Sequence, residues 1–341
     1  MKSNSKWLGS PGFDLVFILL PPFYCLAVLL LFPALFTQQE VNPIAWLILV
    51  LGIDVAHVYS TLFRTYFKAE ARKKWRKLLI VTPIVVWVVA LLLYQFGDLI
   101  FWRVIAYLAV YHFVRQQYGF FKLYNRGVDV PTWEQFIDML AIYGATLYPI
   151  IFWHLSADRN FNWFLAGDFW VKPYPELIPY LGLLYGLILL MYLAKEIRRS
   201  LKLGLNVSKN ILLLGTAFSW YAGIVWFNGD LIFTLFNVVS HGIPYIALVW
   251  LFEQKQTTKR PLFKSAAYLF VFVVAILAFA YIEEGLWDGL VWQEHTALFS
   301  QFSALNQYRS PLILGLVIPL LVVPQVTHYI LDGFIWKRSA S

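Results

Sequence analysis

Four histidines lie in long apolar stretches of the chain, where an ionisable side chain is costly unless it has a partner. They are His57, His112, His241 and His328. Each has a carboxylate or carboxamide three or four positions away, and residues at those spacings share one face of a helix. These polar neighbours are Asp54, Gln116, Asn237 and Asp332. The pattern is typical of metal sites, because a ligating imidazole usually donates its second N–H to an oxygen atom that fixes its tautomer.

The types of these side chains indicate which metal they would bind. Neutral imidazoles without a thiolate suit Fe(II), with Cu or Zn as less favoured alternatives. The single cysteine, Cys25, excludes a cysteine-rich site, and the few carboxylates available favour one iron over a carboxylate-bridged pair. Oxidation of an unactivated lipid needs an oxidant, whereas zinc hydrolysis needs a polar, water-fed site. We therefore predict Fe(II) held by the four histidines, with Asp54, Gln116, Asn237 and Asp332 as supporting groups or auxiliary ligands.

Membrane-spanning helices must position these histidines. Hydrophobic residues make up 60% of the chain, charged residues 13%, and the mean hydropathy is +0.65, which excludes an ordinary soluble domain. Apolar runs of about 20 residues predict an all-α, polytopic transmembrane helix bundle. We expect one integral membrane domain, 1–341, with ten helices at 13–36, 43–64, 77–96, 98–122, 133–154, 177–195, 209–228, 230–252, 262–283 and 311–336. Prolines are expected to kink these helices at Pro21-Pro22, Pro149, Pro244, Pro319 and Pro324.

The distribution of lysine and arginine predicts how the helices cross the membrane. With the N-terminus in the cytoplasm, 22 of the 27 basic residues fall on cytoplasmic segments, as the positive-inside rule requires. We therefore predict cytoplasmic N- and C-termini and a bacterial inner membrane. The four histidines then lie seven to eleven residues from the inner ends of their helices, in a layer about 6 Å deep. The basic loops face anionic lipid, so membrane lipids are expected partners and nucleic acid is not.

The layout of the histidines resembles a known family. His57 and His112 lie 55 residues apart on separate helices, which is similar to the Brp/Blh-type β-carotene dioxygenases. The resemblance implies a multi-pass membrane enzyme with iron held by four histidines, and oxidative cleavage of an apolar isoprenoid. That family has two later histidines close together on one helix, whereas His241 and His328 lie 87 residues apart on different helices. We predict an iron oxygenase that uses O2 on a lipid or isoprenoid, with an electron donor that the sequence does not identify.

Two other functions fit the same histidines. An ion- or proton-coupled transporter would use the histidines with Asp54 and Asp332 as its path, although no internal repeat supports it. A b-type haem protein would use facing histidines as axial ligands for electron transfer, although a common depth favours a single site. An assembly or scaffold protein without chemistry is the fourth interpretation.

The other polar residues near these helices have simpler interpretations. His154 and His295 are predicted to be interfacial or solvated, because one lies at the outer end of a helix and the other in a loop. Arg115 and Gln117, close to His112, either bind the head group of a substrate or extend toward the cytoplasm.

Overall fold

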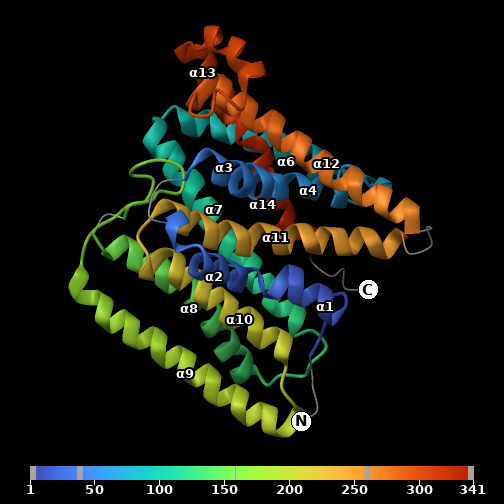
Figure 1. Cartoon of the computed structure of the whole chain (residues 1–341), viewed down its shortest axis with the longest axis vertical. Coiled ribbons are helices and arrows are strands. Elements are labelled where there is room, and N and C mark those ends of the chain that lie inside the picture. The colour runs from blue at the N-terminus through green and yellow to red at the C-terminus, as the bar shows by residue number, and fades with distance from the viewer. Residues whose placement is uncertain (1–4, 37–40, 158, 258–261, 337–341) are drawn as a thin grey trace. The chain divides into compact units, whose positions relative to one another are not determined.

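The computed structural model describes residues 5–36, 41–157, 159–257 and 262–336. All the regular secondary structure assigned within these ranges is helical, which confirms the all-α prediction (Figure 1). Seven helices in these ranges are long and apolar enough to cross a membrane, and an eighth span is added if the bent pair Pro11–Leu19 and Pro21–Leu31 crosses once. These helices suggest an integral membrane protein.

All ten predicted segments coincide with helix, although not all qualify as spans. The seven that do are Pro43–Arg64, Arg76–Tyr94, Thr132–Leu155, Pro175–Leu203, Asp230–Gln254, Ala266–Trp292 and Pro311–Ile335. Helix α7 (Asp98–Tyr124) is long but more polar, since it carries Arg103, Arg115 and neighbouring amides. Helix α10 (Val207–Trp220) is short and continues as the π-helix η5 (Tyr221–Trp226). A total of ten spans therefore stays a prediction.

Proline interrupts the helices at two of the predicted places. The helical segments Pro11–Leu19 and Pro21–Leu31, the latter being α2, meet at an angle of 60°, which confirms the kink predicted at Pro21-Pro22. Helix α13 (Pro311–Leu321) ends just before α14 (Val323–Ile335), which has Pro324 in its first turn. Proline has no N–H and its ring clashes with the preceding turn, so a helix breaks or bends there. The other predicted prolines lie inside helices: Pro149 in α8 (Thr132–Leu155), Pro244 in α11 (Asp230–Thr257) and Pro319 in α13.

Contacts between Cα atoms divide the chain into two compact units. Unit 1 comprises Met1–Asn42 and Val110–Ala247, and unit 2 comprises Pro43–Ala109 and Leu248–Ser341. Each unit therefore combines two separate stretches of the chain. The boundary between the units falls within α7 and within α11, so part of each helix belongs to unit 1 and part to unit 2. The single domain of 1–341 stays a prediction.

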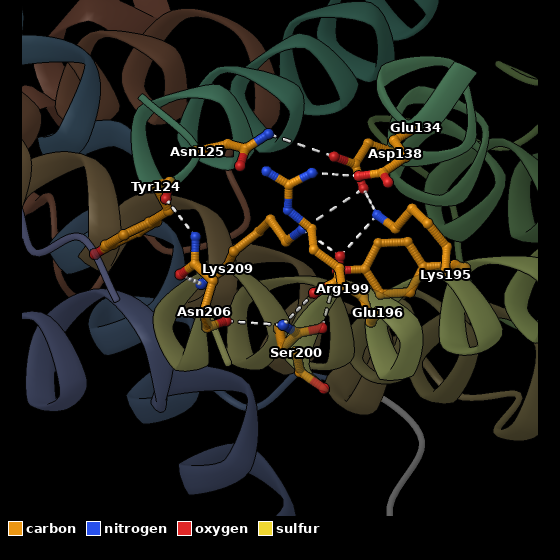
Figure 2. A network of polar contacts seen from close by, with 12 residues as sticks. Tyr124, Asn125, Glu134, Asp138, Lys195, Glu196, Arg199, Ser200, Asn206 and Lys209 are labelled. Carbon is orange, nitrogen blue, oxygen red and sulfur yellow. Dashed lines mark hydrogen bonds and ion pairs between the residues drawn. The ribbon is translucent and has the colours of Figure 1, made fainter. Parts of the chain in front are cut away.

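In unit 1, helix α8 packs against α9 (Ile178–Leu203) and α10, and α10 packs against α2 (Figure 1). A buried network of charges joins the first three of these helices (Figure 2). Lys195 of α9 is ion-paired with Asp138 of α8 and, at 2.7 Å, with Glu196. Lys209 of α10 lies 2.5 Å from Glu196 and 3.6 Å from Asp138. Two cations thus face two anions, and the network is neutral as a whole.

In unit 2, helix α4 (Ala56–Arg64) contacts both α12 (Leu262–Trp287) and α14. Aromatic packing joins α4 to α12, with the ring centroids of Phe63 and Phe272 4.7 Å apart. Helix α14 also packs against α6 (Arg76–Tyr94). The π-helix η3 (Leu47–Val55) leads directly into α4. Side chains of η3 and α4 therefore meet residues from two helices that lie more than 200 positions later in the sequence.

Candidate metal centre

Unit 2 brings two of the predicted ligands together, His57 on α4 and His328 on α14. Their ring centroids are 5.0 Å apart, and the rings meet edge to face at 78°. Both residues are 2% exposed, so neither imidazole is solvated by bulk water. The contact between α4 and α14 explains this pairing of residues that are far apart in the sequence.

Each of these histidines has its predicted carboxylate on the same helical face. Asp54 Oδ1 lies 3.6 Å from His57 Nδ1, and Asp332 Oδ1 lies 3.8 Å from His328 Nδ1. Both distances are longer than a hydrogen bond allows, but they are short enough for the opposite charges of an ion pair to attract each other. The oxygen that His328 Nδ1 contacts directly is Thr61 Oγ1, at 2.7 Å. Thr61 was missed by the sequence analysis, because its partner lies on another helix.

Two further carboxylates of unit 2 also lie near Asp54. The Tyr59 hydroxyl donates to Glu283 Oε2 at 2.5 Å, and the indole N–H of Trp287 donates to Glu283 Oε1 at 3.4 Å. Glu283 and its neighbour Glu284 are close enough to Asp54 for their charges to interact. The predicted helix ends at 283, whereas α12 continues to Trp287, so both glutamates lie within a helix. Unit 2 thus holds two carboxylates near Asp54 that the sequence analysis did not include among the site residues.

Unit 1 brings the other two predicted ligands together, His112 on α7 and His241 on α11. Their ring centroids are 5.1 Å apart at an angle of 80°, and the residues are 4% and 1% exposed. Phe113 stacks on His241 with the centroids 3.5 Å apart and the planes within 6° of parallel. Trp163 packs edge-on against Phe113 at 5.1 Å. Aromatic rings therefore fix the plane of the His241 imidazole.

The two predicted amides of unit 1 bind backbone and do not bind an imidazole through their nitrogens. Gln116 Nε2 donates to the carbonyl of His241 at 2.9 Å, and Asn237 Nδ2 donates to the carbonyl of Phe233 at 2.9 Å. Their side-chain oxygens, Gln116 Oε1 and Asn237 Oδ1, are buried and accept no hydrogen bond from the described part of the chain. A buried acceptor without a donor is costly, so both oxygens could accept a hydrogen bond from a bound ligand.

The geometry of each pair suits two ligands of one metal ion. A metal–nitrogen bond of about 2 Å requires the ligating nitrogens of two imidazoles to approach each other closely, and both pairs have ring centroids near 5 Å. In unit 2 an aspartate lies near Nδ1 of each histidine, where a carboxylate can orient a ligating imidazole. Four neutral imidazoles without a thiolate fit a small metal ion such as Fe(II).

The remaining histidines lie apart from both pairs. His154 Nδ1 donates to the carbonyl of Ile150 at 2.6 Å, one turn earlier in α8. The ring of His295 packs on Trp46 with the centroids 4.1 Å apart, and its backbone N–H donates to Asp288. Both histidines are partly exposed. They serve as matched controls for the four buried histidines.

Comparisons with known proteins assign no function to the chain, so the functional argument rests on the residues described above. No protein-family model, no curated protein and no solved structure matches the chain.

Proposed function

We propose that the protein is an integral membrane, non-haem iron oxygenase that acts on a lipid or isoprenoid. The observation that carries the proposal is the pairing of all four buried histidines, two within each unit, with ring centroids 5.0 and 5.1 Å apart. Four imidazoles without a thiolate suit Fe(II). His57, His112, His241 and His328 are the proposed ligands.

The neighbouring side chains would orient the imidazoles and keep water out. The Thr61 hydroxyl, 2.7 Å from His328 Nδ1, holds the orientation of that ring. Asp54 and Asp332 offer negative charge that offsets the charge of a bound cation. Phe113 covers one face of the His241 ring. Bound Fe(II) would supply the activation of O2 that oxidation of an unactivated hydrocarbon requires.

We propose the finer topology together with this function. Ten spans with the N- and C-termini in the cytoplasm, in a bacterial inner membrane, agree with 22 of 27 basic residues on one side. Membrane lipid would then bring an apolar substrate to the helices directly.

The proposal is tested with nitric oxide, which binds Fe(II) at an open coordination position. Protein purified after growth with iron is reduced, exposed to nitric oxide and examined by EPR and visible absorption. We expect the signal of a non-haem iron–nitrosyl without a Soret band in the wild type and in His154→Ala, and its loss in His241→Ala. A Soret band would support haem b instead, and an EPR-silent protein that has no bound iron would refute the oxygenase.

One observation favours a transporter as the second candidate. Asp54, Glu283 and Glu284 are intramembrane carboxylates whose charges interact, and Tyr59 donates to Glu283. Such groups occur along proton and ion paths. Uptake into proteoliposomes that is lost on Asp54→Asn, in protein that binds no iron, would replace the oxygenase by a transporter.

A further inference from the structure

Arg115 differs from the three cations of unit 1 that are ion-paired, Lys195, Arg199 and Lys209. It lies on α7 three residues after His112, and its side chain is exposed. Lys195, Lys209 and Arg199 are all ion-paired to carboxylates, whereas no carboxylate pairs with Arg115 in the described ranges. The proposed topology places α7 in the membrane, where a guanidinium without a counterion is costly, so an anion from outside the chain would stabilise it.

Two tyrosines hold the guanidinium of Arg115 in place. Arg115 Nη1 donates to the Tyr143 hydroxyl at 2.5 Å, and the guanidinium carbon lies 5.2 Å from the centroid of the Tyr118 ring. The Tyr118 and Tyr143 rings stack on each other with the centroids 5.1 Å apart. Arg115 is therefore attached to α8 and fixed over an aromatic ring, with N–H groups left that can bind an oxyanion in a planar, paired geometry.

The exposed residues next to this guanidinium are apolar. On α7, Tyr111 lies one turn before Arg115 and is 64% exposed. On α8, Leu147 and Ile151 follow Tyr143 at successive turns, and each is 41% exposed. A charged position thus borders a strip of exposed apolar residues on two helices. An amphiphile has the same arrangement, an anionic head joined to a hydrocarbon chain.

Gln117, the other residue considered for head-group binding, is excluded from this role. It is 4% exposed, its amide nitrogen donates to the carbonyl of Ser240 at 3.3 Å, and its oxygen accepts from the Thr216 hydroxyl at 2.9 Å. Its hydrogen-bonding groups are therefore used inside unit 1. Arg115 alone carries the head-group interpretation.

We infer that Arg115, Tyr118 and Tyr143 bind the anionic head group of a membrane lipid, whose chain lies along Tyr111, Leu147 and Ile151. The phosphate of a phospholipid and the carboxylate of a fatty acid share the required chemistry. Because Arg115 lies one helical turn from His112, the bound lipid also indicates the substrate class of the oxygenase, and this last step rests on the proposed function. Lipid binding itself does not depend on iron.

The test measures retention of lipid by the purified full chain. Protein in phosphatidylcholine nanodiscs receives phosphatidylglycerol, or oleate in a second arm, and native mass spectrometry reports the bound lipid. We expect Arg115→Gln to bind phosphatidylglycerol about tenfold more weakly, as loss of a charge-assisted hydrogen bond predicts. The Arg115→Lys variant keeps the charge but loses the paired geometry. Its affinity for phosphatidylglycerol should therefore lie between those of the wild type and Arg115→Gln. A response to oleate alone would identify a carboxylate as the head group.

A matched control separates a site from general attraction of lipid to basic residues. Arg198 also lies 5.2 Å from an aromatic ring, that of Trp133, in the same unit. Arg198→Gln should bind phosphatidylglycerol within about twofold of the wild type if Arg115 forms a distinct site. Equal losses in both variants, or an unchanged Arg115→Gln, would overturn the inference.

The same samples distinguish this inference from the proposed function. Arg115→Gln should retain its iron, and His241→Ala should lose iron while it retains phosphatidylglycerol. Lipid binding without iron in any sample would refute the oxygenase and leave the lipid site intact. Bound iron without a preference for anionic lipid would be consistent with the oxygenase and would refute the lipid site. Arg115 would then only extend to the membrane interface.

Discussion

Replacement of Lys209 by methionine tests whether the buried network of unit 1 holds α8, α9 and α10 together. Lys209 is 2.5 Å from Glu196 Oε1 and 3.6 Å from Asp138 Oδ1. The side chains of Lys195 and Lys209 are 2% exposed, that of Asp138 5% and that of Glu196 7%. Methionine has a similar length and no charge, so the change removes one cation without leaving a large cavity.

The expected magnitude follows from the charges that remain. The wild-type network contains two cations and two anions, and Lys209→Met leaves two anions facing Lys195 alone. Removal of one partner of a buried ion pair costs about 3–5 kcal/mol, because the other charge stays buried without compensation. Replacement of both partners by neutral groups of similar volume costs little or even stabilises. Glu196→Gln should therefore be destabilising by itself and should restore much of the stability when combined with Lys209→Met.

The assay is unfolding in detergent as sodium dodecyl sulfate is added, followed by the fluorescence of the 15 tryptophans. Lys202→Met is the control, since Lys202 lies on the same helix as Glu196 but is exposed, and it should change the unfolding free energy by less than about 0.5 kcal/mol. Lys209→Met with a loss below about 1 kcal/mol, or a double variant whose loss equals the sum of the single losses, would refute this reasoning.

Two other predictions concern the histidine pair of unit 2 and the topology. Thr61→Val should weaken iron binding about 10- to 100-fold, because it removes the hydroxyl at His328 Nδ1, and Thr61→Ser should retain it. Competition with a chelator measures this affinity, and equal affinities in the two variants would contradict the role of the hydroxyl. On a Cys25→Ser background, an impermeant maleimide should label Lys172→Cys and not Lys73→Cys in intact cells, since both positions are exposed but predicted on opposite sides. The reverse labelling would invert the topology.

Much of the helical arrangement could be predicted from the sequence, because hydropathy and proline act locally. The ten apolar runs all coincide with helix, and the predicted kink at Pro21-Pro22 occurs as a 60° bend. Spacing along one helix also placed Asp54 beside His57 and Asp332 beside His328. These contacts need only helical geometry, which a sequence specifies directly.

Contacts between helices could not be predicted in the same way. Thr61 lies next to His328 only because α4 packs against α14, and Glu283 accepts from Tyr59 only because α12 packs against α4. Hydropathy falls at Glu283 and Glu284, so a sequence reading ends the helix there, whereas α12 continues for another turn. The hydrogen bond from Gln116 to the backbone of His241 could not be predicted either, because it joins α7 to α11, which is remote in the sequence.

The most direct test of the central claim is the iron content of purified protein from the wild type and six single His→Ala variants. The account predicts bound iron in the wild type and in the controls His154→Ala and His295→Ala. It predicts a loss of iron in each of the four variants at His57, His112, His241 and His328. Full iron in two or more of those four variants, or loss of iron in the controls to the same degree, would contradict it.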